Sequence, residues 1–207
     1  WEPHLAAKIK ERDEQSELRW AARAKIYQKR RTFANLASTK LRTALSDLNV
    51  SLKFLENAHA PQARDLLIEI MGWRTNQVPR ASVIERYLTV PKLIAAIKAK
   101  DPSPIVSLTS DEGASFFNTQ EANTLIERFS DPKTLARLET VQVTDRPYLT
   151  VTRESVDANG DKHYRTREFA QLSLGQQQSV LLALMLSSEN PNPLLIDQPE
   201  DNLDGQF

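Results

Sequence analysis

The sequence predicts an α/β protein that is mostly helical, and three observations support this prediction. No proline lies between Pro3 and Pro61, so the first stretch lacks the strongest helix breaker. Beyond Pro61, shorter helical segments separated by breakers follow. The pattern then changes to two strand-like runs, an apolar helix and a short apolar strand. We therefore expect a helical arm, a helical subdomain and an α/β lobe, at 1–60, 61–139 and 140–207.

Composition excludes several classes of protein. Of 207 residues, 40% are hydrophobic and 26% charged, which is typical of soluble globular proteins. There is no cysteine, which excludes disulfides and thiolate metal sites and suits a reducing cytoplasm. No apolar run could span a bilayer and no signal peptide opens the chain, so we expect a cytoplasmic protein without a membrane segment. Because the chain begins with Trp1 and not methionine, we expect it to be part of a longer protein.

The N-terminal arm is expected to form one long helix from about Pro3 to Ala58, with a coiled coil in at least its later part. The arm is rich in good helix formers such as alanine, leucine, lysine and glutamate. An apolar stripe recurs in its second half at spacings of three and four residues, which indicates a helix. The stripe consists of Phe33, Ala37, Leu41, Ala44, Leu48, Leu52 and Leu55.

Four arginines of the arm share one helical face. Arg12, Arg19, Arg23 and Arg30 are separated by seven, four and seven residues. A run of charges on a helix is usually a solvated face, and this is the interpretation we favour. The alternative is a stripe that contacts the phosphates of nucleic acid.

Breakers divide the rest of the chain into short elements. Helices are expected at 62–71, 82–88, 91–100, 119–129 and 132–138, with a loop at 101–113. Two strand-like runs, 148–156 and 161–169, flank the turn sequence "DANG". Asn159 and Gly160 tolerate the positive φ of a tight hairpin turn, so we expect a β-hairpin here.

The pentapeptide "LSLGQ", Leu172–Gln176, is expected to open a helix at about 175–188. Unpaired amides and the helix dipole make such an N-terminus an anion site, to which Ser173 adds a hydroxyl and Gly175 an approachable backbone. Taken alone, the pentapeptide is also compatible with an N-capped core helix. The following "SVLLALMLS" is apolar on nearly every face, so we expect it to be buried.

A short apolar strand, 194–197, ends in Asp197, where a carboxylate can bind Mg²⁺. The segment "DNLD" follows and ends at Asp204. In this order, the three motifs resemble the C-terminal half of an ATP-binding-cassette (ABC) ATPase: "LSLGQ" resembles its signature motif, "PLLIDQ" its Walker B strand and "DNLD" its D-loop. With a long helix preceding them, the chain is closer to the SMC/Rad50/RecN-like class than to transporters. The wording "IDQPEDNLD" resembles bacterial TrlF-like ATPases, in which such a domain accompanies a PHP phosphoesterase.

The resemblance implies a role for each motif residue, with ATP and Mg²⁺ as cofactors. Two subunits of a homodimer would sandwich ATP. Ser173, Gly175 and Gln176 would contact the γ-phosphate held by the opposing subunit, Asp197 would bind Mg²⁺, and Asp204 would lie at the dimer seam.

Two residues depart from the family pattern. Leu174 replaces the first glycine of the signature motif, which is tolerable if its side chain points into the helix packing. Gln198 stands where the family has its catalytic glutamate, and glutamine can orient water without accepting its proton. Glu200 is the other candidate for the base, provided that the turn at Pro199 brings it inward.

The Walker A loop is missing. None of the five glycines precedes a lysine, so no G-x-x-x-x-G-K-[ST] loop can cradle phosphates. A lobe that contains Walker A must therefore be a partner, and this chain alone is expected to be inactive.

The leading hypothesis is an SMC/Rad50-like ATPase in nucleic-acid maintenance or antiphage defence, with nucleic acid as a further partner. The alternative, which Gln198 favours, is a non-catalytic, ATP-gated clamp with a coiled-coil arm.

Overall fold

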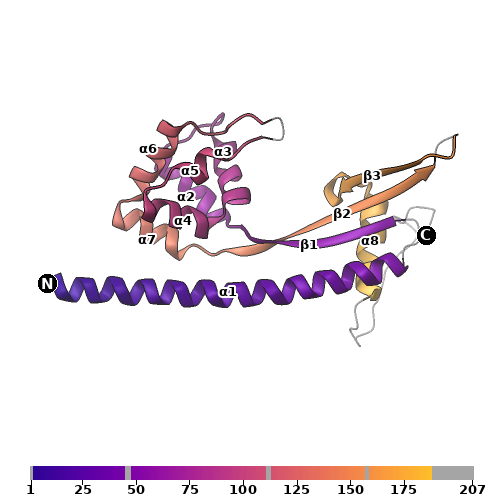
Figure 1. The fold of residues 1–207 in the computed structure, drawn as a ribbon, viewed down its shortest axis with the longest axis horizontal. Helices are drawn as coiled ribbons and strands as arrows, with labels where there is room; N and C mark the ends of the chain where they lie inside the picture. The colour runs from indigo at the N-terminus through magenta and orange to yellow at the C-terminus, as the bar shows by residue number, and fades with distance from the viewer. Residues whose placement is uncertain (1, 45–47, 111–112, 157–158, 188–207) are drawn as a thin grey trace. The chain divides into compact units, whose positions relative to one another are not determined.

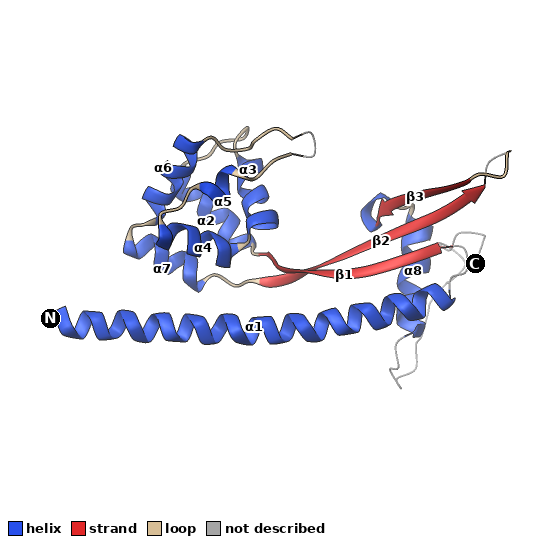
Figure 2. Ribbon diagram, viewed as in Figure 1, coloured by secondary structure: helices blue, strands red, loops and turns tan. Residues whose placement is uncertain are grey.

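The computed structural model describes residues 2–44, 48–110, 113–156 and 159–187 (Figure 1). In this part of the chain the protein is α/β and mostly helical, as predicted, with one three-stranded sheet (Figure 2). None of the described helices combines the length and the apolar character needed to cross a membrane. The elements are α1 (Glu2–Ala44), β1 (Leu48–His59), α2 (Pro61–Met71), α3 (Val78–Val83), a π-helical segment (Ile84–Leu88), α4 (Val90–Ala99), α5 (Ser103–Val106), α6 (Thr119–Phe129), α7 (Pro132–Thr140), β2 (Thr144–Val156), β3 (Lys162–Glu168), a 3-10 turn (Phe169–Gln171) and α8 (Leu174–Ser187).

The chain divides into two compact units, and the boundaries fall inside α1, β1 and β2. The first unit contains Trp1–Lys25 and Leu55–Arg146, and the second contains Ile26–Phe54 and Pro147–Phe207. The expected arm is therefore shared between the units. Each unit has a buried core of its own.

In the first unit, helices α2 to α7 pack around one apolar core (Figure 1). Sequence-encoded caps fix two of them. Asn118 and Glu121 form a reciprocal capping box at the start of α6, and Asp131 accepts a hydrogen bond from the Thr134 amide at the start of α7. Gly72 ends α2 in the left-handed conformation, at φ 67°. The largest fully buried side chains of this core are Phe117, Phe129, Leu67, Ile84, Leu93, Ile97, Ile105, Leu125 and Leu138.

In the second unit, the sheet has the strand order β1-β2-β3. Strands β2 and β3 are antiparallel, and the register places Arg153 opposite Arg165 and Val151 opposite Arg167. Val50 of β1 and Val151 of β2 pack with Leu41 of α1 and with α8. The hairpin that the turn sequence predicted is confirmed, and Gly160 has the positive φ, 87°, that a tight turn requires.

The edge strand β1 is attached to α1 by a buried serine. The Leu52 amide donates to Ser38 Oγ at 2.8 Å, and Ser38 Oγ lies 3.3 Å from the Leu52 carbonyl oxygen. Ser38 is 5% exposed. This contact satisfies backbone groups that an edge strand otherwise leaves without strand partners.

The predicted extent of the arm helix was wrong. Helix α1 ends at Ala44, and Leu48–His59 form strand β1 where the helix was expected to continue to Ala58. In this segment Val50, Leu52 and Phe54 alternate along the chain, and the first two are buried. The segment forms a strand and not a helix because β2 supplies a hydrogen-bonding partner and α1 supplies an apolar surface for the alternating side chains. The apolar stripe was only partly right, because Ala37 and Leu41 are buried whereas Phe33 is 53% exposed.

The other predicted helices agree closely with the structure. The bounds 62–71, 91–100, 119–129 and 132–138 differ from α2, α4, α6 and α7 by at most two residues at either end. The segment predicted as helix at 82–88 comprises the end of α3 and a π-helical turn. The predicted loop at 101–113 contains the short helix α5, which Asp101 stabilises by accepting a hydrogen bond from the Ser103 amide at 2.9 Å.

Candidate functional site

The structure describes one of the three motifs. Ser173, Gly175 and Gln176 lie at the N-terminus of α8, where the sequence placed them. The strand 194–197 and the residues Asp197, Gln198, Glu200 and Asp204 lie outside the described residues. The geometry of the candidate site is therefore that of the signature-like segment and its surroundings.

A reciprocal pair of hydrogen bonds fixes this helix start. The Gln176 amide donates to Ser173 Oγ, and the Ser173 amide donates to Gln176 Oε1, each at 3.3 Å. This is the capping box of a Ser-x-x-Gln sequence. The amides of Leu174 and Gly175 precede the first complete helical turn and are the donors that a capped helix offers to an anion.

Hydrogen bonds also anchor the turn that precedes α8. The Gln177 side chain donates to the carbonyl oxygens of Phe169 and Leu172, at 3.1 and 3.2 Å. Ser179 Oγ donates to the Gly175 carbonyl oxygen at 2.9 Å. The "LSLGQ" segment therefore has a defined backbone path, while Ser173 itself is exposed.

The expectation that α8 is buried was wrong, since Leu181 and Leu186 are 47% and 66% exposed. The condition stated for Leu174 is also not met, because its side chain is 62% exposed and does not point into the helix packing. The described part of the second unit covers only the face of α8 that carries Val180, which packs on β1, β2 and α1. The helix is thus N-capped, as in the simpler interpretation, but it is a core helix on one face only.

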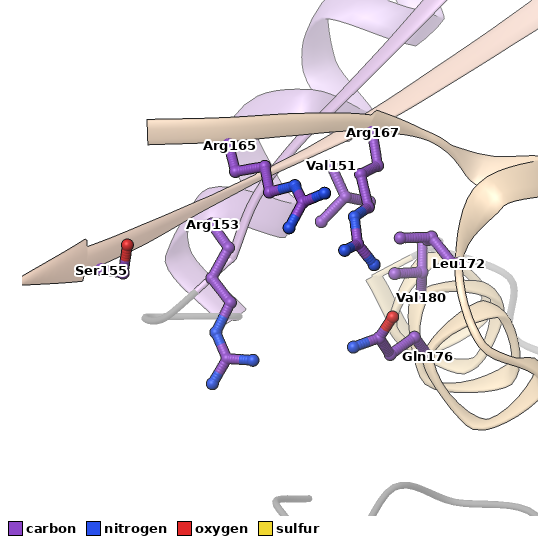
Figure 3. A pocket seen from close by; sticks show the side chains of 8 residues that line it. All are labelled: Val151, Arg153, Ser155, Arg165, Arg167, Leu172, Gln176 and Val180. Atoms are coloured by element: carbon purple, nitrogen blue, oxygen red, sulfur yellow. The ribbon is translucent and has the colours of Figure 1, made fainter. Parts of the chain in front are cut away.

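A cavity of about 280 Å³ lies beside α8 and the hairpin (Figure 3). Three arginines, Arg153 from β2 and Arg165 and Arg167 from β3, point to the side of the hairpin that Gln176 also faces (Figure 3). The remaining lining residues are Val151, Ser155, Leu172 and Val180. Gln176, expected beside Ser173 and Gly175 at the γ-phosphate, thus lines a space within its own chain.

Sequence reasoning missed these three arginines, although a signal for them was present. In a hairpin that turns at "DANG", residues whose numbers sum to 318 are opposite each other, as Arg153 and Arg165 are. Residues two apart on a strand share a face, so Arg167 joins them. Combining the turn with the alternation would have placed all three together.

Three of the four arginines of the α1 stripe pack within the first unit and do not form a solvated face. Arg19 donates to the backbone carbonyl oxygens of Glu139 and Val141. Arg12 Nε lies 3.5 Å from Glu139 Oε2, and Arg23 NH2 lies 3.5 Å from Asp145 Oδ1. The side chains of the two acids are 6% and 0% exposed.

The fourth arginine of the stripe belongs to the second unit and has a different environment. The guanidinium of Arg30 lies over the Phe54 ring, 5.9 Å from its centroid, which is a cation–π distance. The favoured interpretation of the whole stripe as solvated was therefore wrong. These side chains do not support the alternative, a phosphate-contacting surface. Their guanidinium groups already contact backbone carbonyls, carboxylates and an aromatic ring.

The described residues do not offer a metal site. In 2–44, 48–110, 113–156 and 159–187, no group of three or more histidine, aspartate or glutamate side chains could hold a metal ion. The predicted Mg²⁺ ligand, Asp197, lies outside these ranges. Comparison of the chain with family models, curated proteins and solved structures gives no match.

Proposed function

We propose that this chain is the arm and C-terminal lobe of an ABC-type ATPase of the SMC/Rad50-like class. In this proposal, two subunits bind ATP and Mg²⁺ at a homodimer interface, and a lobe that contains Walker A completes each site. The work of the intact protein is nucleic-acid maintenance or antiphage defence in the cytoplasm. The resemblance of three consecutive motifs supports this function.

One structural observation carries the proposal. The "LSLGQ" segment opens a helix, Ser173 is exposed at its N-cap, and the amides of Leu174 and Gly175 follow it. A ligand phosphate at such an N-terminus interacts favourably with these donors and with the helix dipole. Gly175 adds no side chain that would keep the phosphate away, so the residues present suit a γ-phosphate presented by another subunit.

The exposed side chain of Leu174 also fits this proposal. An apolar residue that is 62% exposed beside a phosphate-binding helix start is suited to contact an opposing subunit when the dimer closes. Leu174 would then contribute apolar contact at the place where the family has a glycine.

In the proposed mechanism, catalysis is positioning and electrostatic stabilisation. Asp197 would hold Mg²⁺, which would supply charge neutralisation at the phosphates, and Asp204 would lie at the dimer seam. Either Glu200 accepts the proton of the attacking water, or Gln198 only orients that water. The latter leaves a slow enzyme.

The test uses the parent protein or this chain co-expressed with its Walker A lobe. Ser173→Arg should prevent ATP-dependent dimerisation, because a bulky cation replaces the hydroxyl at the phosphate, while nucleotide binding to the Walker A lobe persists. Ala170→Arg places the same side chain on an exposed position outside the motif and should leave dimerisation intact. Loss of dimerisation in both variants, or in neither, would contradict the proposal.

Turnover distinguishes hydrolysis from a second candidate, the ATP-gated clamp that Gln198 favours. If Glu200 is the base, Glu200→Gln should lower the hydrolysis rate about 10²–10⁴-fold. If the protein is a clamp without a base, Glu200→Gln should have little effect and Gln198→Glu should accelerate hydrolysis. Asp197→Ala should abolish turnover in either case. ATP hydrolysis by the 207-residue chain alone would contradict both candidates.

A further inference from the structure

The three arginines of the hairpin form a positively charged surface that the proposed ATPase site does not use. Arg153 and Arg165 are directly opposite each other on β2 and β3. Like charges at directly opposed positions destabilise a sheet. Arg167, two residues along β3 and on the same face, adds a third positive charge.

Two of these arginines, both on β3, have no carboxylate partner among the described residues. Within the described part of the chain, neither Arg165 nor Arg167 forms an ion pair with an acidic side chain. One acid of the hairpin, Glu154, pairs instead with Lys162 at 2.6 Å. Both of these residues lie on the other face of the hairpin, because strand side chains alternate.

The cavity between these arginines and α8 has a mixed lining (Figure 3). Guanidinium groups and the Gln176 side chain line it together with the apolar side chains of Val151, Leu172 and Val180. Its volume of about 280 Å³ is near the lower end of the range for small-molecule sites, roughly 300–1,000 Å³. An anionic group with an organic body of moderate size suits this mixed lining.

We propose that this cavity binds a phosphate-bearing ligand of nucleotide size. The arginines receive the phosphate, because guanidinium groups form paired hydrogen bonds to phosphate oxygens and tolerate partial desolvation. The Gln176 amide adds a polar contact, and the apolar lining side chains contact the sugar or base. Bound phosphate offsets the repulsion between Arg153 and Arg165.

This site is distinct from the proposed γ-phosphate contact. Ser173, the exposed N-cap of α8, does not line the cavity, whereas Gln176 does. The proposal therefore does not depend on ATP hydrolysis or on a second subunit. Its ligand can come from two sources, a free nucleotide or a phosphate of a nucleic-acid strand.

The primary experiment measures binding of inorganic pyrophosphate to the 207-residue chain by calorimetry. Removing both positive charges with Arg165→Gln and Arg167→Gln should weaken binding at least about tenfold, the scale of a lost charge-assisted contact. Lys162→Gln removes one positive charge from the opposite face of the same hairpin and should change affinity less than about twofold. No pyrophosphate binding by the wild-type chain, or equal loss in the double variant and in Lys162→Gln, overturns the proposal.

A further variant keeps the result interpretable. If the double glutamine variant fails to fold by circular dichroism, Arg165→Lys with Arg167→Lys retains the charge and should still bind several-fold more weakly, because lysine lacks the planar fork. Unchanged binding in this lysine variant would overturn the proposal. Failure of this site is distinguishable from failure of the proposed ATP contact, because pyrophosphate binding is measured on the 207-residue chain without the Walker A lobe.

The source of the phosphate is resolved with three probes, AMP and a short single-stranded oligonucleotide with or without a 5′-phosphate. Tighter binding of AMP than of either oligonucleotide assigns the site to a free nucleotide. Tighter binding of the phosphorylated oligonucleotide assigns it to a strand end, and equal binding of both oligonucleotides, lost in the double variant, assigns it to backbone phosphates. If every probe still binds to the double variant as it does to the wild type, the proposal is overturned.

Discussion

The chain contains two groups of arginines that differ in what surrounds them. In the first unit, Arg12, Arg19 and Arg23 of α1 meet the buried carboxylates of Glu139 and Asp145 and two backbone carbonyl oxygens. In the second unit, Arg153, Arg165 and Arg167 share one face of the β2–β3 hairpin beside a cavity. The first group has its counter-charges within the fold, while Arg165 and Arg167 have none among the described residues.

This difference shows why arginine clustering alone does not identify a binding surface. The stripe on α1 was interpreted from the sequence as a solvated face, with phosphate contact as the alternative, but three of its arginines pack within the first unit. The hairpin arginines were not predicted from the sequence to form a group, but they line a positively charged cavity. The deciding quantity is the local charge balance after folding, which depends on acids more than 80 positions away from the arginines of α1.

The largest expected effect on stability concerns the buried carboxylate of Asp145, which lies beside the arginines of α1. Asp145 has a fully buried side chain, accepts a hydrogen bond from the Asn57 amide at 3.0 Å and lies 3.5 Å from Arg23. Asp145→Ala leaves the Arg23 charge without this partner and should lower the free energy of unfolding by about 3–5 kcal/mol. Urea unfolding measures this change.

The control for Asp145 is an exposed acid of the same unit. Glu127→Ala on α6 should change the free energy of unfolding by less than about 0.5 kcal/mol. Equal effects of the two substitutions would show that the contact between Arg23 and Asp145 does not stabilise the fold.

A smaller effect is expected at Arg19. Arg19→Ala leaves the carbonyl oxygens of Glu139 and Val141 without their donor and should cost about 2 kcal/mol. Arg19→Lys should recover only part of this loss, because one ammonium cannot reproduce the guanidinium fork. Lys25→Ala, at an exposed position six residues along α1, serves as the control in the same unfolding measurement. Full recovery by lysine would show that only charge matters at this position.

The hairpin arginines are expected to respond with the opposite sign. Arg165→Gln removes the repulsion with Arg153 and should raise the free energy of unfolding of the ligand-free chain by about 0.2–1 kcal/mol. Lys162→Gln removes the exposed ion pair with Glu154 and should lower stability slightly, by about 0–1 kcal/mol. Thermal unfolding without phosphate measures both. Destabilisation by Arg165→Gln would mean that this arginine is structural, like those of α1.

The smallest expected effect is a dependence on pH. The hydrogen bond from Lys98 to Asp13, at 3.1 Å, lowers the pKa of the Asp13 carboxyl despite some opposing desolvation, and Arg12 adds to the lowering. A lowered folded-state pKa means that this stabilisation is present above the ordinary value of about 4 and is lost as the pH falls through the folded-state pKa.

The comparison of wild type with Asp13→Asn tests this pH dependence. At neutral pH the wild type should be slightly more stable, since the Asp13 side chain is 45% exposed and solvent screens its ion pairs. The difference between the two should shrink as the pH falls below about 4 and through the lowered folded-state pKa of Asp13. A difference that stays constant across urea titrations from pH 7 to pH 3 would rule out the carboxylate as its cause.

Much of the fold could be predicted because its signals are local. The capping box at Asn118 and Glu121 starts α6 at the predicted residue. The hairpin followed from Asn159-Gly160 between two alternating runs, and the start of α8 from "LSLGQ". In each case a few neighbouring residues satisfy the backbone, so no distant contact is needed.

The candidate site was less predictable. Ser173 and Gly175 were placed correctly at a helix start, but the exposure of Leu174 was not foreseen because it depends on what packs against α8. The strand β1 was mistaken for helix, because Leu48, Leu52 and Leu55 also fit helical spacing. Short apolar segments are ambiguous in this way, and the partner strand decides between the two structures.

The sequence by itself determined where the helices start, where the chain turns and which side chains share a face of α1 or of the hairpin. These properties follow from backbone conformation and from the periods of helix and strand, which a few neighbouring residues set. Only the tertiary structure decided what each face meets. Glu139 and Asp145 neutralise one arginine group, whereas a cavity adjoins the other. The physical reason is that the energy of a charge depends on its neighbours in space and on its burial, and neither can be read from the spacing of residues along the chain.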